Sequence, residues 1–209
     1  AEHTEGAFRK KTFELVQYAA GIAQQQGTTT TALVLGTITD DPLQQLGNYG
    51  ANKVLHVADE KLNTLSSRAY TKAVLTAAGQ ENAKVIVLSH DVTGKAVAPR
   101  VAARLKAGMV AGAVSLPNPD NGFALKKSVF SGKAFAYVSI SSEQKVITLM
   151  PNTFQVKKGE GVATVEKLSV SFEDKDFGIQ VKEVNKVTGD VPLGEAELVV
   201  SGGRGMKGP

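Results

Sequence analysis

The apolar positions of the first hundred residues alternate between a helical and a strand-like pattern. Between Phe8 and Gln26 they recur at helical spacing, from Leu15 to Ala23, so that one face of the helix is apolar. Helices are expected likewise over 40–46 and 66–78. A fourth helix is expected after residue 90, with Pro99 in its first turn.

Short, continuous apolar runs separate these helices, over 31–36, 53–57 and 84–89. Apolar strands that alternate with helices are typical of a parallel sheet covered on both faces. The first half of the chain is therefore predicted to be an α/β domain of three layers.

After Met109 the pattern changes. The segments 122–130, 133–141 and 145–150 are strand-like and are divided by Ser-rich turns, which favours an added antiparallel region. One more alternating strand is expected within 162–172, and the charged residues 173–176 are expected to form a solvated turn. The polar stretch that follows predicts three parts: an N-terminal α/β domain over 1–177, a linker over 178–194, and the start of a second nucleotide-binding α/β domain over 195–209.

Composition narrows the class of protein. The chain has 209 residues, 42% of them hydrophobic and 21% charged, which is typical of a globular protein with a core of its own. Because it has no Cys, it has no disulfides, thiolate metal ligands or cysteine nucleophile. A net charge of +4 with no polybasic arm argues against nucleic acid as a partner.

Two further expectations concern the location of the protein and the start of the chain. No apolar run reaches the length of a membrane span and no targeting sequence is seen, so a cytoplasmic location without membrane insertion is expected. The opening residues Ala1 to Thr4 have the character of a strand end that enters a loop, and there is no initiator Met. Residues are therefore expected to be missing before Ala1.

The richest polar segment is Ser89–Lys95, which follows a predicted strand and precedes a predicted helix. Open α/β sheets bind ligands at this position, so one hypothesis is a free-standing adenine-nucleotide-binding domain. The segment is not a P-loop, and adjacent Ser89, His90 and Asp91 seldom converge into a catalytic relay. The simpler interpretation is a helix cap made by Asp91 or Thr93.

Other polar residues form no recognisable site. His3, His56 and His90 lie far apart in the sequence, so no metal site is predicted. No spacing marks a general acid and base among the acidic residues, and solvent exposure is the expected state of Glu2, Glu5 and Glu14. Arg100 and Arg104 share one helix face, where a solvated stripe or a domain contact is favoured over phosphate binding. No catalytic residue is assigned.

The last fifteen residues contain the strongest candidate for a cofactor contact. A strand is predicted over Glu197–Val200, followed by the glycine-rich turn Ser201–Gly205. Gly202, Gly203 and Gly205 would let the backbone approach phosphate oxygens closely, and Arg204 is well placed for a diphosphate. The helix on which such a phosphate site depends has no room between Met206 and Pro209.

The chain resembles the electron transfer flavoprotein alpha subunit over nearly its whole length. The two most specific segments are Pro-Arg-Val-Ala-Ala-Arg-Leu and Val-Val-Ser-Gly-Gly-Arg-Gly, about a hundred residues apart in the expected order. The residues that carry the resemblance are Ala1–His3, Ala96–Leu105, Tyr137, Met150–Phe154 and Val199–Gly205.

The resemblance implies an electron carrier rather than a substrate-converting enzyme. Such a carrier takes electrons from flavin dehydrogenases, for example those acting on acyl-CoA in fatty acid β-oxidation. It delivers them to a membrane quinone oxidoreductase. The resemblance also implies a heterodimer with a beta subunit and FAD held mainly by a C-terminal domain. It further implies contact of the FAD diphosphate with Gly202, Gly203, Arg204 and Gly205.

The family's later flavin-binding motifs would follow Pro209 and are not in the sequence. The chain is therefore similar to the N-terminal domain plus the first loop of the FAD domain, as in a fragment. Such a fragment is expected to bind flavin weakly or not at all, and to serve as scaffold and beta-subunit interface. The alternatives left open are the nucleotide-binding domain above and an interaction module without a ligand.

Overall fold

The computed structural model describes residues 1–4, 6–179, 181–183, 196 and 198–206. Glu5, Glu197 and most of the expected linker therefore lie outside the described residues. The chain divides into two compact units, Ala1–Ile179 and Gln180–Pro209. The helices and the strands described below all belong to the first unit, with the exception of a short 3-10 helix at Arg204–Met206.

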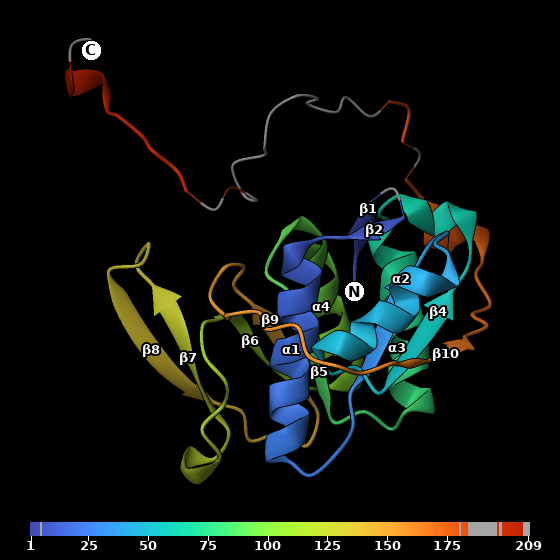
Figure 1. The fold of residues 1–209 in the computed structure, drawn as a ribbon, viewed down its shortest axis with the longest axis horizontal. Helices are drawn as coiled ribbons and strands as arrows, with labels where there is room; N and C mark the ends of the chain where they lie inside the picture. The colour runs from blue at the N-terminus through green and yellow to red at the C-terminus, as the bar shows by residue number, and fades with distance from the viewer. Residues whose placement is uncertain (5, 180, 184–195, 197, 207–209) are drawn as a thin grey trace. The chain divides into compact units, whose positions relative to one another are not determined.

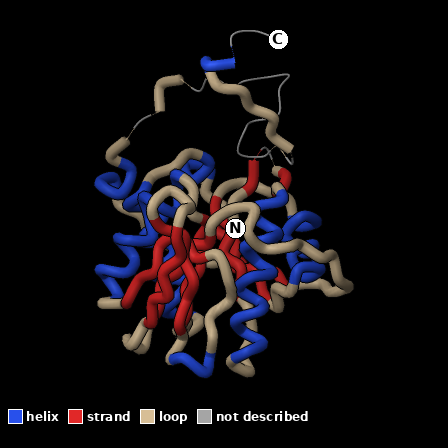
Figure 2. The backbone as a smooth tube through the Cα atoms, turned by 90° about the vertical axis from the view of Figure 1, so that its left-hand side faces the viewer, coloured by secondary structure: helices blue, strands red, loops and turns tan. Residues whose placement is uncertain are grey.

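The first unit contains two sheets with helices on both sides of the strands (Figures 1 and 2). A parallel three-stranded sheet has the order β10-β4-β3, and a mixed five-stranded sheet has the order β5-β9-β6-β7-β8. A two-stranded antiparallel pair, β1 and β2, lies near the N-terminus. The strands are β1 His3–Thr4, β2 Ala7–Phe8, β3 Thr31–Leu35, β4 Lys53–Val57, β5 Val85–Ser89, β6 Gly108–Ala113, β7 Ala124–Val129, β8 Ala134–Ser139, β9 Lys145–Leu149 and β10 Thr164–Lys167.

Four α-helices cover the strands: α1 Lys10–Gln25, α2 Asp40–Gln45, α3 Ser67–Gln80 and α4 Val92–Leu105. Helix α1 contributes to two apolar clusters, because Leu15 packs with residues of the five-stranded sheet and Val16 with residues of the three-stranded sheet. Helices α3 and α4 pack against each other, and Val101 lies with Val146 of β9 in a further cluster. The predicted α/β class is confirmed, and the core lies between these helix layers and the strands.

In the second half of the sequence, the direction of one expected strand is wrong and another strand was missed. Residues 145–150 were expected to be antiparallel, but β9 runs parallel to both β5 and β6, between them. Its apolar run is buried over Val146–Leu149, as in a strand covered on both faces. Strand β6 was not predicted, since its Gly and Ala residues have low β-propensity and a bulge interrupts it at Gly112, where φ is +74°. The β7–β8 hairpin is antiparallel, as expected.

Pro99 also lies elsewhere than predicted. It is inside α4 rather than in the first turn, which begins at Val92. Pro cannot donate the helical hydrogen bond to the carbonyl four residues earlier, here that of Lys95. Both Pro99 and Lys95 are exposed, so water can take that place.

The strand predicted over Glu197–Val200 is absent at residues 198–200, which are irregular and exposed. A strand needs a neighbour to pair its backbone groups, and no described strand pairs with this segment. The predicted strand within 162–172 is confirmed but short: β10 covers Thr164–Lys167 and pairs in parallel with β4.

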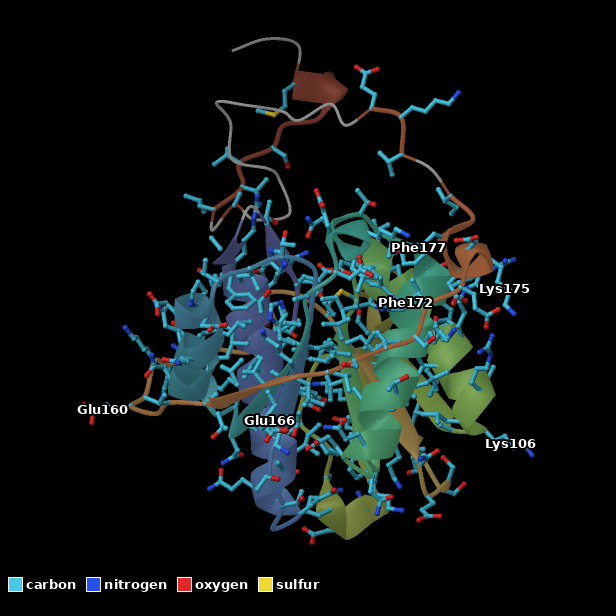
Figure 3. All side chains as sticks on the ribbon, turned by 90° about the vertical axis from the view of Figure 1, so that its right-hand side faces the viewer. Lys106, Glu160, Glu166, Phe172, Lys175 and Phe177 are labelled. Carbon is cyan, nitrogen blue, oxygen red and sulfur yellow. The ribbon has the colours of Figure 1, made fainter. Side chains whose placement is uncertain are left out.

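Of the charged residues expected to form a solvated turn, Glu173, Asp174 and Lys175 are exposed, but Asp176 is buried. Phe172 and Phe177 lie edge to face with ring centroids 5.3 Å apart. Both residues are labelled in Figure 3. Asp176 is buried and its carboxylate accepts a hydrogen bond from Lys72 Nζ at 2.9 Å. The Asp176 side chain also accepts from the Glu173 backbone N–H, which begins a short 3-10 helix at Asp174–Phe177.

Candidate functional site

The predicted cofactor loop lies in the second unit. Ser201–Gly203 is irregular, and Met206 N donates to Gly203 O at 3.0 Å in the short 3-10 helix that follows. A Cβ added at Gly203 or Gly205 would meet nothing within 4 Å, so the backbone there is open to close approach. At Gly202 such an atom would lie 2.9 Å from Met206 Sδ. The assignment of Gly202, Gly203, Arg204 and Gly205 to a diphosphate stays a prediction.

The polar segment Ser89–Lys95 lies at the carboxyl end of β5, where the pattern placed it. Asp91 is the N-cap of α4, and its Oδ1 accepts a hydrogen bond from Gly94 N at 3.1 Å. Its other oxygen, Oδ2, accepts from Lys11 Nζ at 2.9 Å. The capping interpretation is confirmed, and both carboxylate oxygens of Asp91 already have partners within the protein.

Lys11 joins this cap to the N-terminal residues. Its ammonium group donates to Glu2 Oε2 at 3.0 Å as well as to Asp91. Burial opposes the charge on both Lys11 and Asp91. The Gly94 N–H and Lys11 nevertheless hold the pKa of Asp91 below its usual value, and the two carboxylates raise the pKa of Lys11. Glu2 is thus half-buried in an ion pair rather than solvated.

His90 does not form a relay with its sequence neighbours. Its Nδ1 lies 2.8 Å from Thr148 Oγ1 on β9, and that hydroxyl also accepts a hydrogen bond from Gly112 N at 2.9 Å. Burial first, and then the charges of Lys95 and Lys127, lower the pKa of His90, so the ring is neutral at pH 7.

The other two histidines are bound to backbone carbonyls. His3 Nε2 lies 3.0 Å from Leu35 O, and His56 Nε2 lies 2.8 Å from Gly36 O. Burial lowers the pKa of His3, whose Nδ1 is buried without a hydrogen-bond partner. Within the described residues, no group of three His, Asp or Glu side chains could hold a metal ion.

Glu14 was expected to be solvated, and this expectation is wrong. Its side chain is 2% exposed. Its carboxylate accepts three backbone hydrogen bonds, from Asn152 N at 2.9 Å, Thr153 N at 2.8 Å and Phe154 N at 2.7 Å. Glu14 thus fixes the loop after β9 to helix α1. Its partners are far away in the sequence, so no local pattern marked it.

Arg100 and Arg104 are exposed on α4, in agreement with a solvent-facing stripe. Neither arginine lies within the cavity described next.

None of the helices in the described part of the chain has the length and apolar character of a bilayer-spanning segment.

One cavity of the first unit is lined by residues of strands β3 and β5 and has a volume of about 730 Å³. Helices α1, α3 and α4 supply apolar side chains to its walls, among them Leu15, Tyr70 and Val97. Asp91 and Gly94 line one part of it, but the cap described above uses their polar groups. The geometry therefore gives no support to a nucleotide site at this edge.

An exposed aromatic surface lies on the β7–β8 hairpin. We define this surface by Phe130, Phe135 and Tyr137, which are 78%, 55% and 73% exposed. Phe135 and Tyr137 alternate with half-buried residues along β8, so they share one face. Lys126 Nζ lies 3.9 Å from the Phe135 ring centroid, in a cation–π contact. Strand β8 is the outer strand of its sheet, at the left of Figure 1.

A comparison with known protein families matches residues 1–173 to the electron transfer flavoprotein domain. The chain belongs to the electron transfer flavoprotein domain family. The resemblance found in the sequence is thereby confirmed, and the α/β architecture described above is the fold that this flavoprotein domain adopts here.

Named relatives extend the match beyond the domain. The chain is 32% identical over 209 residues to electron transfer flavoprotein subunit alpha of Bacillus subtilis (strain 168), covering 99% of this chain and 63% of the relative. It is 30% identical to Protein FixB of Clostridium saccharobutylicum, with 99% of this chain and 63% of that protein covered. It is 29% identical to the alpha subunit of Syntrophomonas wolfei, with 100% and 65% covered. The chain thus spans about two thirds or less of these relatives' length.

Proposed function

We propose that the chain is part of the alpha subunit of an electron transfer flavoprotein, an electron carrier that converts no substrate. One observation carries the proposal: relatives named as this subunit align with 99% or more of the chain, including the second unit. The polar groups of the first unit support it, because Glu14, Asp91 and His90 are engaged in holding the fold together. Such a scaffold suits a carrier, whose chemistry belongs to its cofactor.

The cofactor that we propose for the full-length protein is FAD, which supplies the reversible uptake of electrons. Gly202, Gly203, Arg204 and Gly205 would contact its diphosphate. The open backbone at Gly203 and Gly205 fits an approaching phosphate. A helix of three residues offers few N–H groups to an anion, so this loop alone is one wall of a site. We expect the 209-residue chain alone to bind FAD weakly or not at all.

The partner that we propose is an electron transfer flavoprotein beta subunit, with the aromatic surface of the β7–β8 hairpin as part of the interface. Contiguous exposed apolar side chains mark interaction sites, and Phe and Tyr are enriched in interface cores. Tyr137 is also among the residues that carry the family resemblance. We further propose flavin dehydrogenases as electron donors, a membrane quinone oxidoreductase as electron acceptor, and a cytoplasmic location.

The test combines the purified chain with the beta subunit from the same organism. Sedimentation velocity is expected to show a one-to-one complex, while visible absorption of the chain alone shows no stoichiometric flavin. Phe135→Ser and Tyr137→Ser should weaken the complex at least tenfold each, since hot-spot aromatics are worth about 2 kcal/mol or more. Val162→Ser is the matched control, because Val162 is 78% exposed on another part of the first unit.

Two results would contradict the proposal. Absence of any complex with the beta subunit would remove the assigned partner. A yellow preparation of the 209-residue chain with one FAD per chain would show that the cofactor site is complete without further sequence. If the complex forms but Phe135→Ser and Val162→Ser bind equally well, the interface lies elsewhere than on the hairpin.

A further inference from the structure

The solvent-exposed side of helix α4 carries a concentrated positive charge. Lys95, Arg100 and Arg104 are exposed on the helix, and Lys106 follows directly as its C-cap and projects from the surface in Figure 3. Between residues 92 and 119 the sequence contains no Asp or Glu. The chain has 24 Lys and Arg against 20 Asp and Glu, so these four cations equal its whole net charge of +4. The remaining charges of the chain cancel one another.

The elements packed against α4 supply no carboxylate to these cations. Helix α4 packs mainly against α3, β5, β6 and β9, and none of these four elements contains an acidic residue. Among the described residues, Lys11, Lys53 and Lys72 each pair with a carboxylate, whereas the four cations of α4 form no ion pair. The positive charge on this side of the helix is therefore not neutralised within the described part of the protein.

Helix stability explains only part of this charge. The helix dipole favours cations near the C-terminal end, where Arg104 and Lys106 lie, but disfavours Lys95 near the beginning of the helix. Arg100 and Arg104 are four residues apart, a spacing at which like charges destabilise a helix. Protein surfaces normally mix charges of both signs, and a field of one sign is the pattern that steers an oppositely charged partner. A role in binding is therefore indicated.

An exposed apolar strip runs between the cations. It consists of Val92, which is 78% exposed, and of Pro99 and Ala103, which are also exposed. Because successive residues turn by about 100°, the spacings of seven and four place these three on one line along the helix. The two arginines lie on one side of this line, and Lys95 lies on the other. We call the strip together with the four cations the basic face of α4.

The pattern of the basic face defines the chemistry of its partner. A complementary surface has carboxylates on both sides of an apolar stripe, which is the pattern of an acidic amphipathic helix. The basic face is about 21 Å long from Val92 to Lys106, at 1.5 Å per residue. Small side chains at Pro99 and Ala103 let a second helix approach closely. A lipid surface fits less well, because helices that lie in membranes insert large apolar side chains such as Trp, Phe and Leu.

We propose that the basic face of α4 is a docking surface for an acidic amphipathic helix of a partner protein. Carboxylates of that helix pair with Arg100 and Arg104 on one side and with Lys95 on the other, and its apolar stripe covers Pro99 and Ala103. Each guanidinium group can bind a carboxylate through two hydrogen bonds. Because the pairs are exposed, the complex forms fast, has modest affinity and weakens with salt. This surface is distinct from the aromatic surface of the β7–β8 hairpin.

The experiment measures binding of a fluorescent helical peptide to the 209-residue chain by anisotropy, in about 50 mM and about 300 mM NaCl. The peptide has about 18 residues, long enough to form a helix, with Glu on both sides of one stripe of Leu and Ala. A reference peptide has Gln in place of every Glu. The test variant combines Arg100→Gln with Arg104→Gln. The matched control combines Lys157→Gln with Lys158→Gln, which removes two exposed cations from the loop after β9.

The acidic peptide is expected to bind the chain and the lysine control equally at low salt. Binding should weaken about tenfold in the arginine variant and at high salt, and the Gln peptide should not bind. The arginine variant should keep the melting temperature of the chain, because both side chains are exposed.

Three results would overturn the proposal. The first is no binding of the acidic peptide at low salt, or equal binding by the arginine variant and the lysine control. The second is arginine-dependent binding to vesicles with about 30% anionic phospholipid in the absence of peptide binding, since the ligand would then be a lipid. The third is displacement of the peptide by the beta subunit, which would make the basic face part of the subunit interface. Peptide binding requires neither flavin nor the beta subunit, so the proposed function is tested separately.

Discussion

Glu14 provides the sharpest test of what holds the first unit together. One buried carboxylate accepts three consecutive backbone N–H groups of the loop that follows β9. In Glu14→Gln the amide oxygen can keep the two bonds that Oε1 accepts, from Thr153 and Phe154. The new NH₂ group, however, faces the N–H of Asn152, so two donors meet. In Glu14→Ala all three N–H groups lose their acceptor.

The magnitude follows from the number of bonds. A hydrogen bond to a charged group is worth about 1.5–3 kcal/mol, and a buried donor left unpaired costs about 1–3 kcal/mol. Asn152 and Thr153 are exposed as residues, so water can reach part of the loop and the lower values apply. We expect a loss of about 2 kcal/mol of unfolding free energy for Glu14→Gln and about 4 kcal/mol for Glu14→Ala.

Urea denaturation followed by circular dichroism measures this loss. With a slope of about 2 kcal/mol per molar urea, the midpoint should fall by about 1 M for Glu14→Gln and about 2 M for Glu14→Ala. Glu160→Gln is the matched control, because Glu160 is exposed and projects from the surface in Figure 3. Its midpoint should move by less than about 0.3 M. A Glu14→Ala midpoint no lower than that of the control would refute the reasoning.

Three further outcomes are expected. Burial lowers the pKa of both His3 and His90, so the unfolded chain takes up protons first on acidification. The stability that these groups contribute is therefore complete above about pH 6.5 and is lost as the pH falls toward their folded pKa values. A flat urea midpoint between pH 7 and 5 would contradict this expectation. Thr148→Val should cost about 1–2 kcal/mol, since Gly112 N and the His90 ring both lose a partner, and unchanged urea unfolding would exclude this network. Calorimetric titration with ATP and AMP should show no tight binding, because Asp91 is already engaged, whereas micromolar affinity that is lost in Asp91→Ala would favour the nucleotide-binding alternative.

Local patterns were enough to predict the first half of the fold. The helix over α1 and the strands β3, β4 and β5 lie within a few residues of the positions that periodicity gave. These elements have a regular apolar repeat and are ended by residues such as Gly27 that favour a turn. The direction of β9 was missed because no helix separates it from the β7–β8 hairpin, although its apolar run has the pattern of a strand covered on both faces.

The residues of the candidate site show the same difference between local and long-range contacts. Asp91 could be identified as a cap because its partner, Gly94, is three residues away. Glu14 could not be identified, because the N–H groups that it binds lie about 140 residues later in the chain. The roles of Gly202, Gly203, Arg204 and Gly205 come from family resemblance, and the binding experiments above remain their test.

Strand β10 has a consequence for the order in which the protein can fold. It completes the sheet of β3 and β4, but it is synthesised roughly a hundred residues after β4. The segment just before it passes directly over Gly47, where an added Cβ would lie 2.4 Å from Ala163 N. During translation, the outer side of β4 therefore stays open until residues 163–167 have left the ribosome. Contacts so distant in sequence form slowly, which leaves this side of β4 exposed to chaperones and to premature association in the nascent chain.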